Sequence, residues 1–179
     1  MSADRALASR IVERVRDVPD FPTPGILFKD ITPVLADAAL MTELLDHMHE
    51  TAKPTRPDII VAIESRGFII GAPLAHALGI GFAPIRKPGK LPWQTVRVEY
   101  ALEYGTDAIE MHTDGVRPGQ RVLVVDDVLA TGGTAASAVQ LVRQLGGEVV
   151  GTSFVIELAF LNGRARLEPL GVETVVRYE

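Results

Sequence analysis

Two adjacent acids and a glycine turn form the part of the sequence best suited to chemistry. Asp126 and Asp127 follow a purely aliphatic run, Val122 to Val125, and a Thr-Gly-Gly-Thr turn begins at Thr131. Paired carboxylates accept hydrogen bonds from vicinal hydroxyls, as in a ribose ring, or bind Mg²⁺ through water. Glycines let the backbone curl with its N–H groups pointing inward, and a helix that starts there favours an anion. The stretch therefore predicts a site for a monophosphate attached to a polyhydroxylated group.

The predicted phosphate cradle differs from two familiar nucleotide-binding motifs. No lysine follows its glycines, as a Walker A loop requires, and the G-x-G-x-x-G spacing of dinucleotide sites is absent. Each feature alone has an ordinary explanation, because acids are common near strand ends and a glycine turn can be only a flexible loop. Their combination directly after an aliphatic strand favours the functional interpretation. The predicted cradle consists of Ala130, Thr131, Gly132, Gly133 and Thr134.

The segments around this motif alternate between strand-like and helix-like patterns. The run DIIVAIE at 58–64 is apolar on both faces, as expected for a strand covered on both sides of a parallel sheet. Leu7, Ile11 and Val15 recur every four residues, which predicts an amphipathic helix that ends before Pro19. This alternation predicts an α/β fold with a central, mostly parallel sheet flanked by helices. Further strands are expected at 81–86, 121–127, 148–158 and 174–178, and further helices at 40–48, 68–79 and 134–146.

The segment 87–112 interrupts the alternation with proline, glycine and then alternating strand-like residues, which predicts a flexible hairpin or flap. Ligands of such sheets bind beyond the carboxyl ends of the strands. Arg66 lies in the turn after strand 58–64, where a guanidinium and exposed amides suit an anion. The ordinary alternative for Arg66 is a surface salt bridge, and a lysine in an exposed loop, such as Lys87, is usually only solvated.

Composition and charge exclude several classes of protein. The chain has 179 residues, 47% of them apolar, and a net charge of −5, which fits one globular domain over 1–179 and argues against broad nucleic-acid binding. It contains no cysteine and four scattered histidines, so any metal should be held by oxygen. No apolar run is long enough to span a bilayer, and the N-terminus lacks a signal-peptide pattern. We therefore expect a cytoplasmic protein with a small-molecule partner and without a nucleic-acid or membrane partner.

The run VLVVDDVLATGGTAASA resembles the signature of the type I phosphoribosyltransferases, which bind 5-phosphoribosyl 1-diphosphate. The segments FPTPGILFKDITPVL, ESRGF, IRKPGKLP and LEYGTDAIEMH follow the order found in the adenine-using branch of that family. The resemblance implies the type I phosphoribosyltransferase fold, with an N-terminal hood at 1–35, a flexible catalytic loop at 87–112 and a donor-binding motif at 121–137. It also implies a Mg²⁺-dependent reaction of adenine with the phosphoribosyl donor, giving AMP and diphosphate in purine salvage.

The resemblance also implies roles for individual residues. Asp126 and Asp127 would hold the ribose hydroxyls, with Mg²⁺ carried by the substrate and reaching them through water; an anchoring role behind the ribose is the alternative for Asp127. The cradle at 130–134 would hold the 5-phosphate. The residues implied to bind diphosphate are Ser65, Arg66, Lys87 and Lys90. Those implied to bind adenine, through backbone groups and ring stacking, are Leu27, Phe28 and Lys29.

Glu103 matches the family residue proposed to act as general acid or base towards the purine, and Tyr104 stands beside it, where a closing loop could shield the reaction from water. The alternative for Glu103 is the solvent face of a hairpin, and for Phe28 it is a place in the core. The family commonly has arginine where Lys29 stands. A planar side-chain contact is therefore in doubt there, although a backbone contact would survive the change.

Two other functions stay open at this point. A phosphoribosyltransferase for hypoxanthine, guanine, xanthine or orotate would share the 121–137 stretch, but the segment FPTPGILFKD disfavours it. A non-catalytic regulator that senses the phosphoribosyl donor would share the fold, but it would ordinarily carry a DNA-binding module and a basic face, neither of which the sequence contains. The resemblance also implies a homodimer.

Overall fold

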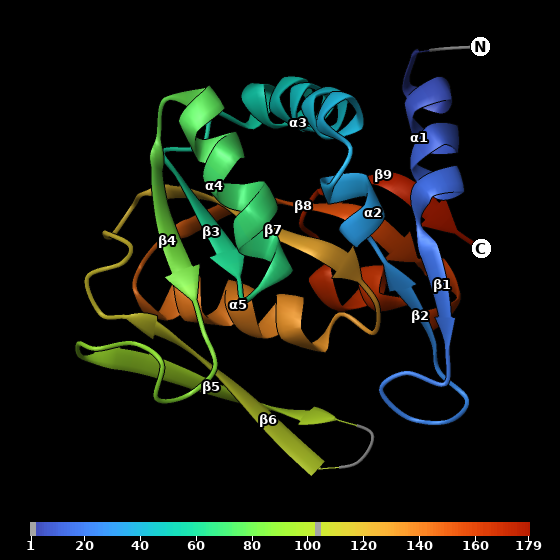
Figure 1. Cartoon of the computed structure of the whole chain (residues 1–179). Coiled ribbons are helices and arrows are strands. Elements are labelled where there is room, and N and C mark those ends of the chain that lie inside the picture. The colour runs from blue at the N-terminus through green and yellow to red at the C-terminus, as the bar shows by residue number, and fades with distance from the viewer. Residues whose placement is uncertain (1–2, 103–104) are drawn as a thin grey trace. The chain divides into compact units, whose positions relative to one another are not determined.

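The computed structural model describes residues 3–102 and 105–179 (Figure 1). The chain divides into two compact units, residues 1–47 and 48–179, which are described one at a time. Whether the chain behaves as the single domain expected from its length stays a prediction. No helix in the described part of the chain is long and apolar enough to cross a membrane.

The first unit contains helices and a short hairpin. Leu7 and Ile11 are buried, which confirms the predicted amphipathic helix, although that helix ends at Arg14. The antiparallel hairpin was not predicted, because its four-residue strands leave most side chains exposed or half-buried and show no clear alternation. The elements are α1 (Ala3–Arg14), β1 (Arg16–Pro19), β2 (Leu27–Asp30), α2 (Thr32–Leu35) and the first part of α3 (Ala38–Ala52).

The second unit is built on a five-stranded sheet. The strand order is β4-β3-β7-β8-β9, and every neighbouring pair is parallel. The predicted α/β class with a central parallel sheet is therefore confirmed. The strands are β3 (Ile59–Ile63), β4 (Gly81–Ile85), β7 (Arg121–Leu129), β8 (Glu148–Leu158) and β9 (Val172–Tyr178).

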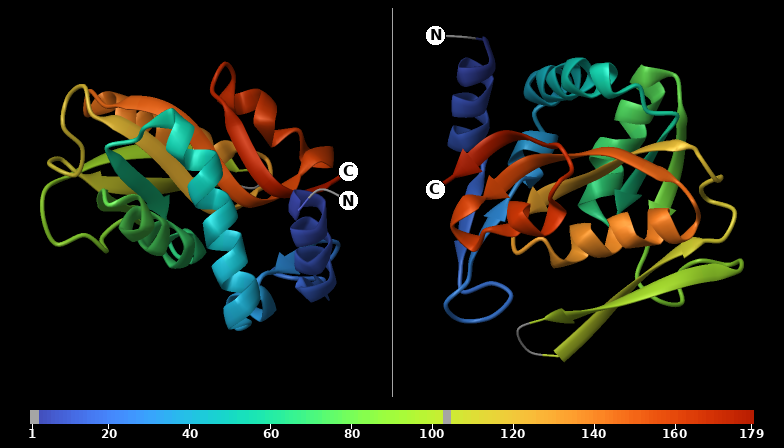
Figure 2. Two further views of the ribbon diagram at one scale, coloured as in Figure 1. Left: turned by 90° about the horizontal axis from the view of Figure 1, so that it is seen from above. Right: turned by 180° about the vertical axis from the view of Figure 1, so that it is seen from behind.

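Helices cover both faces of this sheet. α4 (Arg66–Leu78) follows β3, and α5 (Gly133–Gln144) follows β7. Because successive side chains of a strand point to opposite faces, Ile60 and Ala62 lie against α4, whereas Val61 joins the core cluster that includes α5. The two helices lie on opposite sides of the sheet in Figures 1 and 2. Every residue of β3 is buried, which explains why its sequence is apolar throughout.

The segment predicted as a flap contains an antiparallel hairpin of β5 (Thr95–Leu102) and β6 (Gly105–His112). Val98 and Ile109 are buried in the same core cluster as the side chains of α5. A bridge between Arg86 and Glu110 joins the hairpin to the segment after β4. The hairpin is thus packed beside α5 (Figure 1), and its flexibility stays a prediction.

Three short 3₁₀ helices complete the second unit. η1 (Lys53–Thr55) precedes β3, while η2 (Ala159–Leu161) and η3 (Gly163–Leu167) lie between β8 and β9. None of them was predicted, since a single turn is too short to show a helical period. The turn of η2 and η3 matters for the site, because it reaches the glycine turn after β7.

Candidate active site

Two adjoining pockets lie at the carboxyl ends of β3, β4 and β7. One, of about 80 Å³, is lined by Asp126 and residues 128–135. Because Asp126 and Thr134 line both pockets, the structure brings the residues predicted for ribose, 5-phosphate and diphosphate together. The other pocket is larger, with a volume of about 150 Å³, and its lining includes Ser65, Arg66, Lys87, Asp126 and Asp127. Lys90 lines neither pocket, but it forms an ion pair with Glu64, which lines the larger pocket.

The paired acids lie within β7, whereas the predicted strand at 121–127 would have ended with them. The strand continues to Leu129 because its last residues keep their pairing with β8. Asp127 is only 4% exposed and forms an ion pair with Arg66. Arg66 therefore does make a salt bridge, but its partner is an acid of the site. The Asp127 backbone N–H donates a hydrogen bond of 2.9 Å to Oδ1 of Asp126.

The ionisation of Asp126 is perturbed by its surroundings. Burial raises the pKa of this carboxyl well above its usual value, and the neighbouring Asp127 carboxylate adds to the rise. The pocket therefore disfavours two negative charges side by side. Groups that donate hydrogen bonds, such as vicinal hydroxyls, would offset this cost.

The glycine turn after β7 leads directly into α5. The helix begins at Gly133, one residue before the predicted start at Thr134. Gly132 has a φ of 78°, in the left-handed region that favours glycine, and its carbonyl accepts a hydrogen bond from Ala136. The first N–H groups of a helix have no partner within the helix. The turn thus places backbone donors and the positive end of α5 together, as the predicted phosphate cradle requires.

The backbone of Gly163 in η3 packs directly against this turn. A Cβ atom on Gly163 would lie 2.1 Å from the carbonyl oxygen of Ala130 and 2.8 Å from the amide nitrogen of Gly132. One on Gly132 would lie 2.4 Å from the carbonyl oxygen of Gly163. Only glycines allow such an approach. Gly163 was not among the predicted site residues, although the Asn-Gly pair at 162–163 is a turn signal.

A buried ion pair holds η3 in place. Glu157 of β8 is 2% exposed and receives two hydrogen bonds from Arg164, from Nε at 2.9 Å and from Nη2 at 2.6 Å. Nη1 of Arg164 donates to the carbonyl of Val172 at 2.7 Å. The Arg164 guanidinium lowers the pKa of Glu157, so the carboxylate stays ionised. Arg164 thereby ties the start of η3 to both β8 and β9.

Three of the four predicted diphosphate residues, all except Ser65, are cations held by carboxylates. Lys87 pairs with Asp107 of the hairpin, and Lys90 pairs with Glu64. Burial alone would lower the pKa of Lys87, but its hydrogen bonds to Asp107 and Tyr100 outweigh that effect and the pKa is raised. Lys87 therefore keeps its positive charge, as the role predicted for it requires.

Tyr100 connects the hairpin to the phosphate cradle, a role for which the sequence offered no signal. The Thr134 hydroxyl donates to the Tyr100 hydroxyl at 3.2 Å, and the Tyr100 hydroxyl donates to Oδ2 of Asp107 at 3.0 Å. The same Tyr100 oxygen accepts a hydrogen bond of 3.3 Å from Lys87. These contacts couple the position of the hairpin to that of the cradle.

The residues predicted to bind adenine lie on β2 in the first unit. The Phe28 ring packs edge-on against Phe21, with 5.1 Å between the ring centroids. Lys29 forms an ion pair of 2.6 Å with Asp17 on β1. Leu27 is 49% exposed. Their predicted contact with adenine stays a prediction.

Two other predictions concern residues or groups that the structure leaves untested. Glu103 and Tyr104 lie outside the described residues. Within residues 3–102 and 105–179, no group of three or more histidine or acidic side chains is arranged to hold a metal ion. The two carboxylates at the pocket are hard oxygen donors, so they fit the prediction of Mg²⁺ carried by the substrate and reached through water.

Comparison with known proteins agrees with this geometry. The sequence profile of the family described as "Phosphoribosyl transferase domain" matches residues 29–175. A parallel sheet with paired acids, a glycine cradle and cations at one edge is thus the framework of a phosphoribosyltransferase domain.

Individual relatives show which phosphoribosyltransferases this chain is similar to. An adenine phosphoribosyltransferase from Acetivibrio thermocellus is 57% identical over 166 residues, which is 92% of this chain and 97% of the relative. The crystal structure of adenine phosphoribosyltransferase from Thermoanaerobacter pseudethanolicus is similar with a TM-score of 0.93 and 48% identity, over 96% of this chain and 99% of that one. The corresponding enzyme from Saccharomyces cerevisiae has a TM-score of 0.89 and 40% identity, over 96% and 99% of the two chains. The chain belongs to the adenine phosphoribosyltransferase family.

Proposed function

We propose that this protein transfers the 5-phosphoribosyl group from 5-phosphoribosyl 1-diphosphate to adenine, giving AMP and diphosphate in purine salvage. The observation that carries the proposal is the pair of adjoining pockets in which acids, a glycine cradle and cations meet. The family membership supports adenine as the acceptor. The yeast relative was crystallised with adenine and an imino-altritol bisphosphate, a pairing of base and phosphorylated ring that fits the same proposal.

In the proposed reaction, a purine nitrogen forms a bond to the anomeric carbon as the bond from that carbon to diphosphate breaks. Asp126 and Asp127 accept hydrogen bonds from the ribose hydroxyls, and the cradle at 130–134 holds the 5-phosphate. Fixing the sugar at both ends aligns the anomeric carbon for attack. Mg²⁺ would supply positive charge to the departing diphosphate, held through water by the two acids.

Ser65, Arg66, Lys87 and Lys90 receive the diphosphate in this proposal. The three cations are already paired with carboxylates, which keeps them oriented at the edge of the sheet. Diphosphate carries more charge than any one carboxylate, so it would compete for these cations on binding. Release of Lys87 from Asp107 and Tyr100 would also break the hydrogen bonds that join the segment after β4 to the hairpin.

Adenine would contact Leu27, Phe28 and Lys29, through backbone groups and the Phe28 ring. Glu103 would accept the proton that the attacking purine nitrogen loses, and Tyr104 would help exclude water. A cytoplasmic location and a homodimer complete the proposal.

A panel of bases tests the function. The purified protein is mixed with Mg²⁺ and the phosphoribosyl donor, and adenine, hypoxanthine, guanine, xanthine and orotate are offered separately. We expect AMP from adenine alone, separated by chromatography, and loss of product when EDTA removes the metal. Formation of a nucleotide from another base would support the reaction class but contradict the adenine site proposed on β2. Donor binding without any product would indicate a sensor.

Glu103→Gln tests the proton-transfer role. We expect kcat to fall by about 100-fold, because general acid–base catalysis contributes roughly that much or more, while binding of the donor is unchanged. Glu99→Gln, on the exposed part of the same hairpin, is the matched control. Equal kcat values for the two variants would assign Glu103 to the solvent face of the hairpin.

A further inference from the structure

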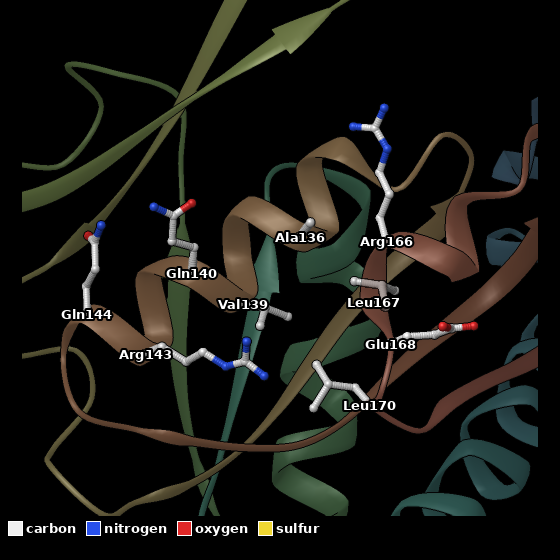
Figure 3. A pocket seen from close by; sticks show the side chains of 9 residues that line it. All are labelled: Ala136, Val139, Gln140, Arg143, Gln144, Arg166, Leu167, Glu168 and Leu170. Atoms are coloured by element: carbon white, nitrogen blue, oxygen red, sulfur yellow. The ribbon is translucent and has the colours of Figure 1, made fainter.

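The side chain of Arg166 extends from η3 towards the phosphate cradle. Its Nη1 atom lies 3.8 Å from the point that a Cβ on Gly133 would occupy, and Oγ1 of Thr131 lies 3.9 Å from the same point. A guanidinium and a predicted phosphate ligand therefore flank the first residue of α5. Figure 3 shows the Arg166 side chain rising beside the amino end of α5.

Two other charged side chains near Arg166, those of Arg143 and Glu168, do not extend towards the cradle. An open groove of about 480 Å³ runs between α5 and η3, over an apolar floor that includes Val139 and Leu170. Arg143 also lines that groove, about three turns further along α5 than Gly133. The Glu168 carboxylate points away from the Arg166 guanidinium (Figure 3). Among residues 3–102 and 105–179, no hydrogen bond or ion pair engages Arg166.

Two contacts fix the backbone just before Arg166. Gly163 packs against Ala130 and Gly132, and the adjacent Arg164 is bound to the buried Glu157. Arg166 follows two residues later on the same turn. A long, exposed side chain loses conformational freedom when it binds an anion, but here its base is already positioned relative to the cradle.

We infer that Arg166 is a further phosphate-binding residue, whose guanidinium binds the 5-phosphate held by the cradle. This inference rests on the proposed function and adds a side-chain cation to a site otherwise made of backbone amides, hydroxyls and the helix end. A phosphate monoester carries close to two negative charges at neutral pH. Guanidinium matches its oxygens with two parallel donors, which an ammonium or a hydroxyl does not provide.

Titration calorimetry with two ligands tests the inference. Ribose 5-phosphate carries the phosphate in question, whereas magnesium diphosphate would occupy only the diphosphate residues. We expect Arg166→Gln to weaken ribose 5-phosphate binding by about tenfold or more, as loss of a charge-assisted hydrogen bond does, with diphosphate affinity unchanged. Arg143→Gln, which removes the same charge from the same groove, should bind both ligands like the wild type. Arg166→Lys should recover part of the lost affinity.

The outcomes separate the inference from the proposed function. If the wild type binds ribose 5-phosphate and Arg166→Gln binds it equally well, the inference is wrong and the proposed function stands. Equal losses in Arg166→Gln and Arg143→Gln would show a general effect of charge and would also overturn it. If the wild type binds neither ligand and forms no AMP, the proposed function itself fails. Matching melting temperatures for all variants ensure that folded proteins are compared.

Discussion

Replacing both Asp126 and Asp127 by Asn is expected to lower kcat/KM for the phosphoribosyl donor by about 1000-fold. Each charged hydrogen bond contributes roughly 1.5–3 kcal/mol, so loss of two removes about 4 kcal/mol of transition-state stabilisation. Asn can still accept hydrogen bonds, but it lacks the negative charge. Steady-state kinetics with adenine in excess measure the effect.

The same double variant should fold nearly as well as the wild type. Asp127→Asn removes an ion pair with Arg66, whose side chain is 37% exposed, whereas Asp126→Asn removes a buried carboxyl beside a like charge. The two effects have opposite signs, so the free energy of unfolding should change by less than about 1 kcal/mol. Asp114→Asn, on an exposed turn after β6, provides the matched control for kinetics and stability. A double variant with the kcat/KM of that control would contradict the assignment of both acids.

The pH dependence of stability gives an independent check on Asp126. Its pKa is raised in the folded protein above the usual 3.8, so the folded state binds more protons than the unfolded chain as pH rises above that value. Stability therefore falls with rising pH across the interval between the two pKa values. Urea denaturation at several pH values should show this slope for the wild type and a flatter one for Asp126→Asn.

Gly163→Ala is expected to lower kcat/KM by about 100-fold, since a displacement near 1 Å at a positioning element can have that effect. The new methyl group would lie 2.1 Å from the carbonyl oxygen of Ala130 and 2.8 Å from the amide nitrogen of Gly132. Both are backbone atoms, so the cradle must move to relieve the overlap. We also expect a loss of about 1–3 kcal/mol in the free energy of unfolding, as in other overpacked sites.

Gly171→Ala is the matched control for this variant. Gly171 precedes β9, in the same connection between β8 and β9, and a Cβ placed there meets no atom within 4 Å. Comparison of the two variants separates the close contact with the cradle from the general effect of replacing a glycine. If Gly163→Ala retains the activity and stability of Gly171→Ala, the cradle does not depend on its packing against η3.

Local patterns predicted much of the second unit correctly. β3 is a continuous apolar run because helices cover both sheet faces. β8 agrees with the predicted 148–158 at both ends. The signature at 121–137 predicted the paired acids and the glycine turn within one strand–turn–helix unit, and β7, the turn and α5 have that arrangement. The ligands predicted for these residues stay predictions. Such a unit encodes its function in consecutive residues, so a single sequence is sufficient to recognise it.

The ends of the elements and the pairing of distant strands were harder to predict from the sequence. The prediction ended the strand at Asp127, but pairing with β8 carries β7 on to Leu129. Pairing between distant segments is invisible to local periodicity. The hairpin of β1 and β2 was missed for a related reason, because its strands are short and largely exposed.

The contacts that position the site join residues far apart in the sequence. Asp127 meets Arg66, Lys87 meets Asp107, and Gly163 meets Ala130. Residue types and spacing were enough to predict the class of fold and to place the paired acids and the glycine turn in one strand–turn–helix unit. Which carboxylate holds each cation, and which turn lies against the cradle, depended on how strands and helices pack. These contacts are determined by how separate elements pack against one another, and a local stretch of sequence carries no information about that packing.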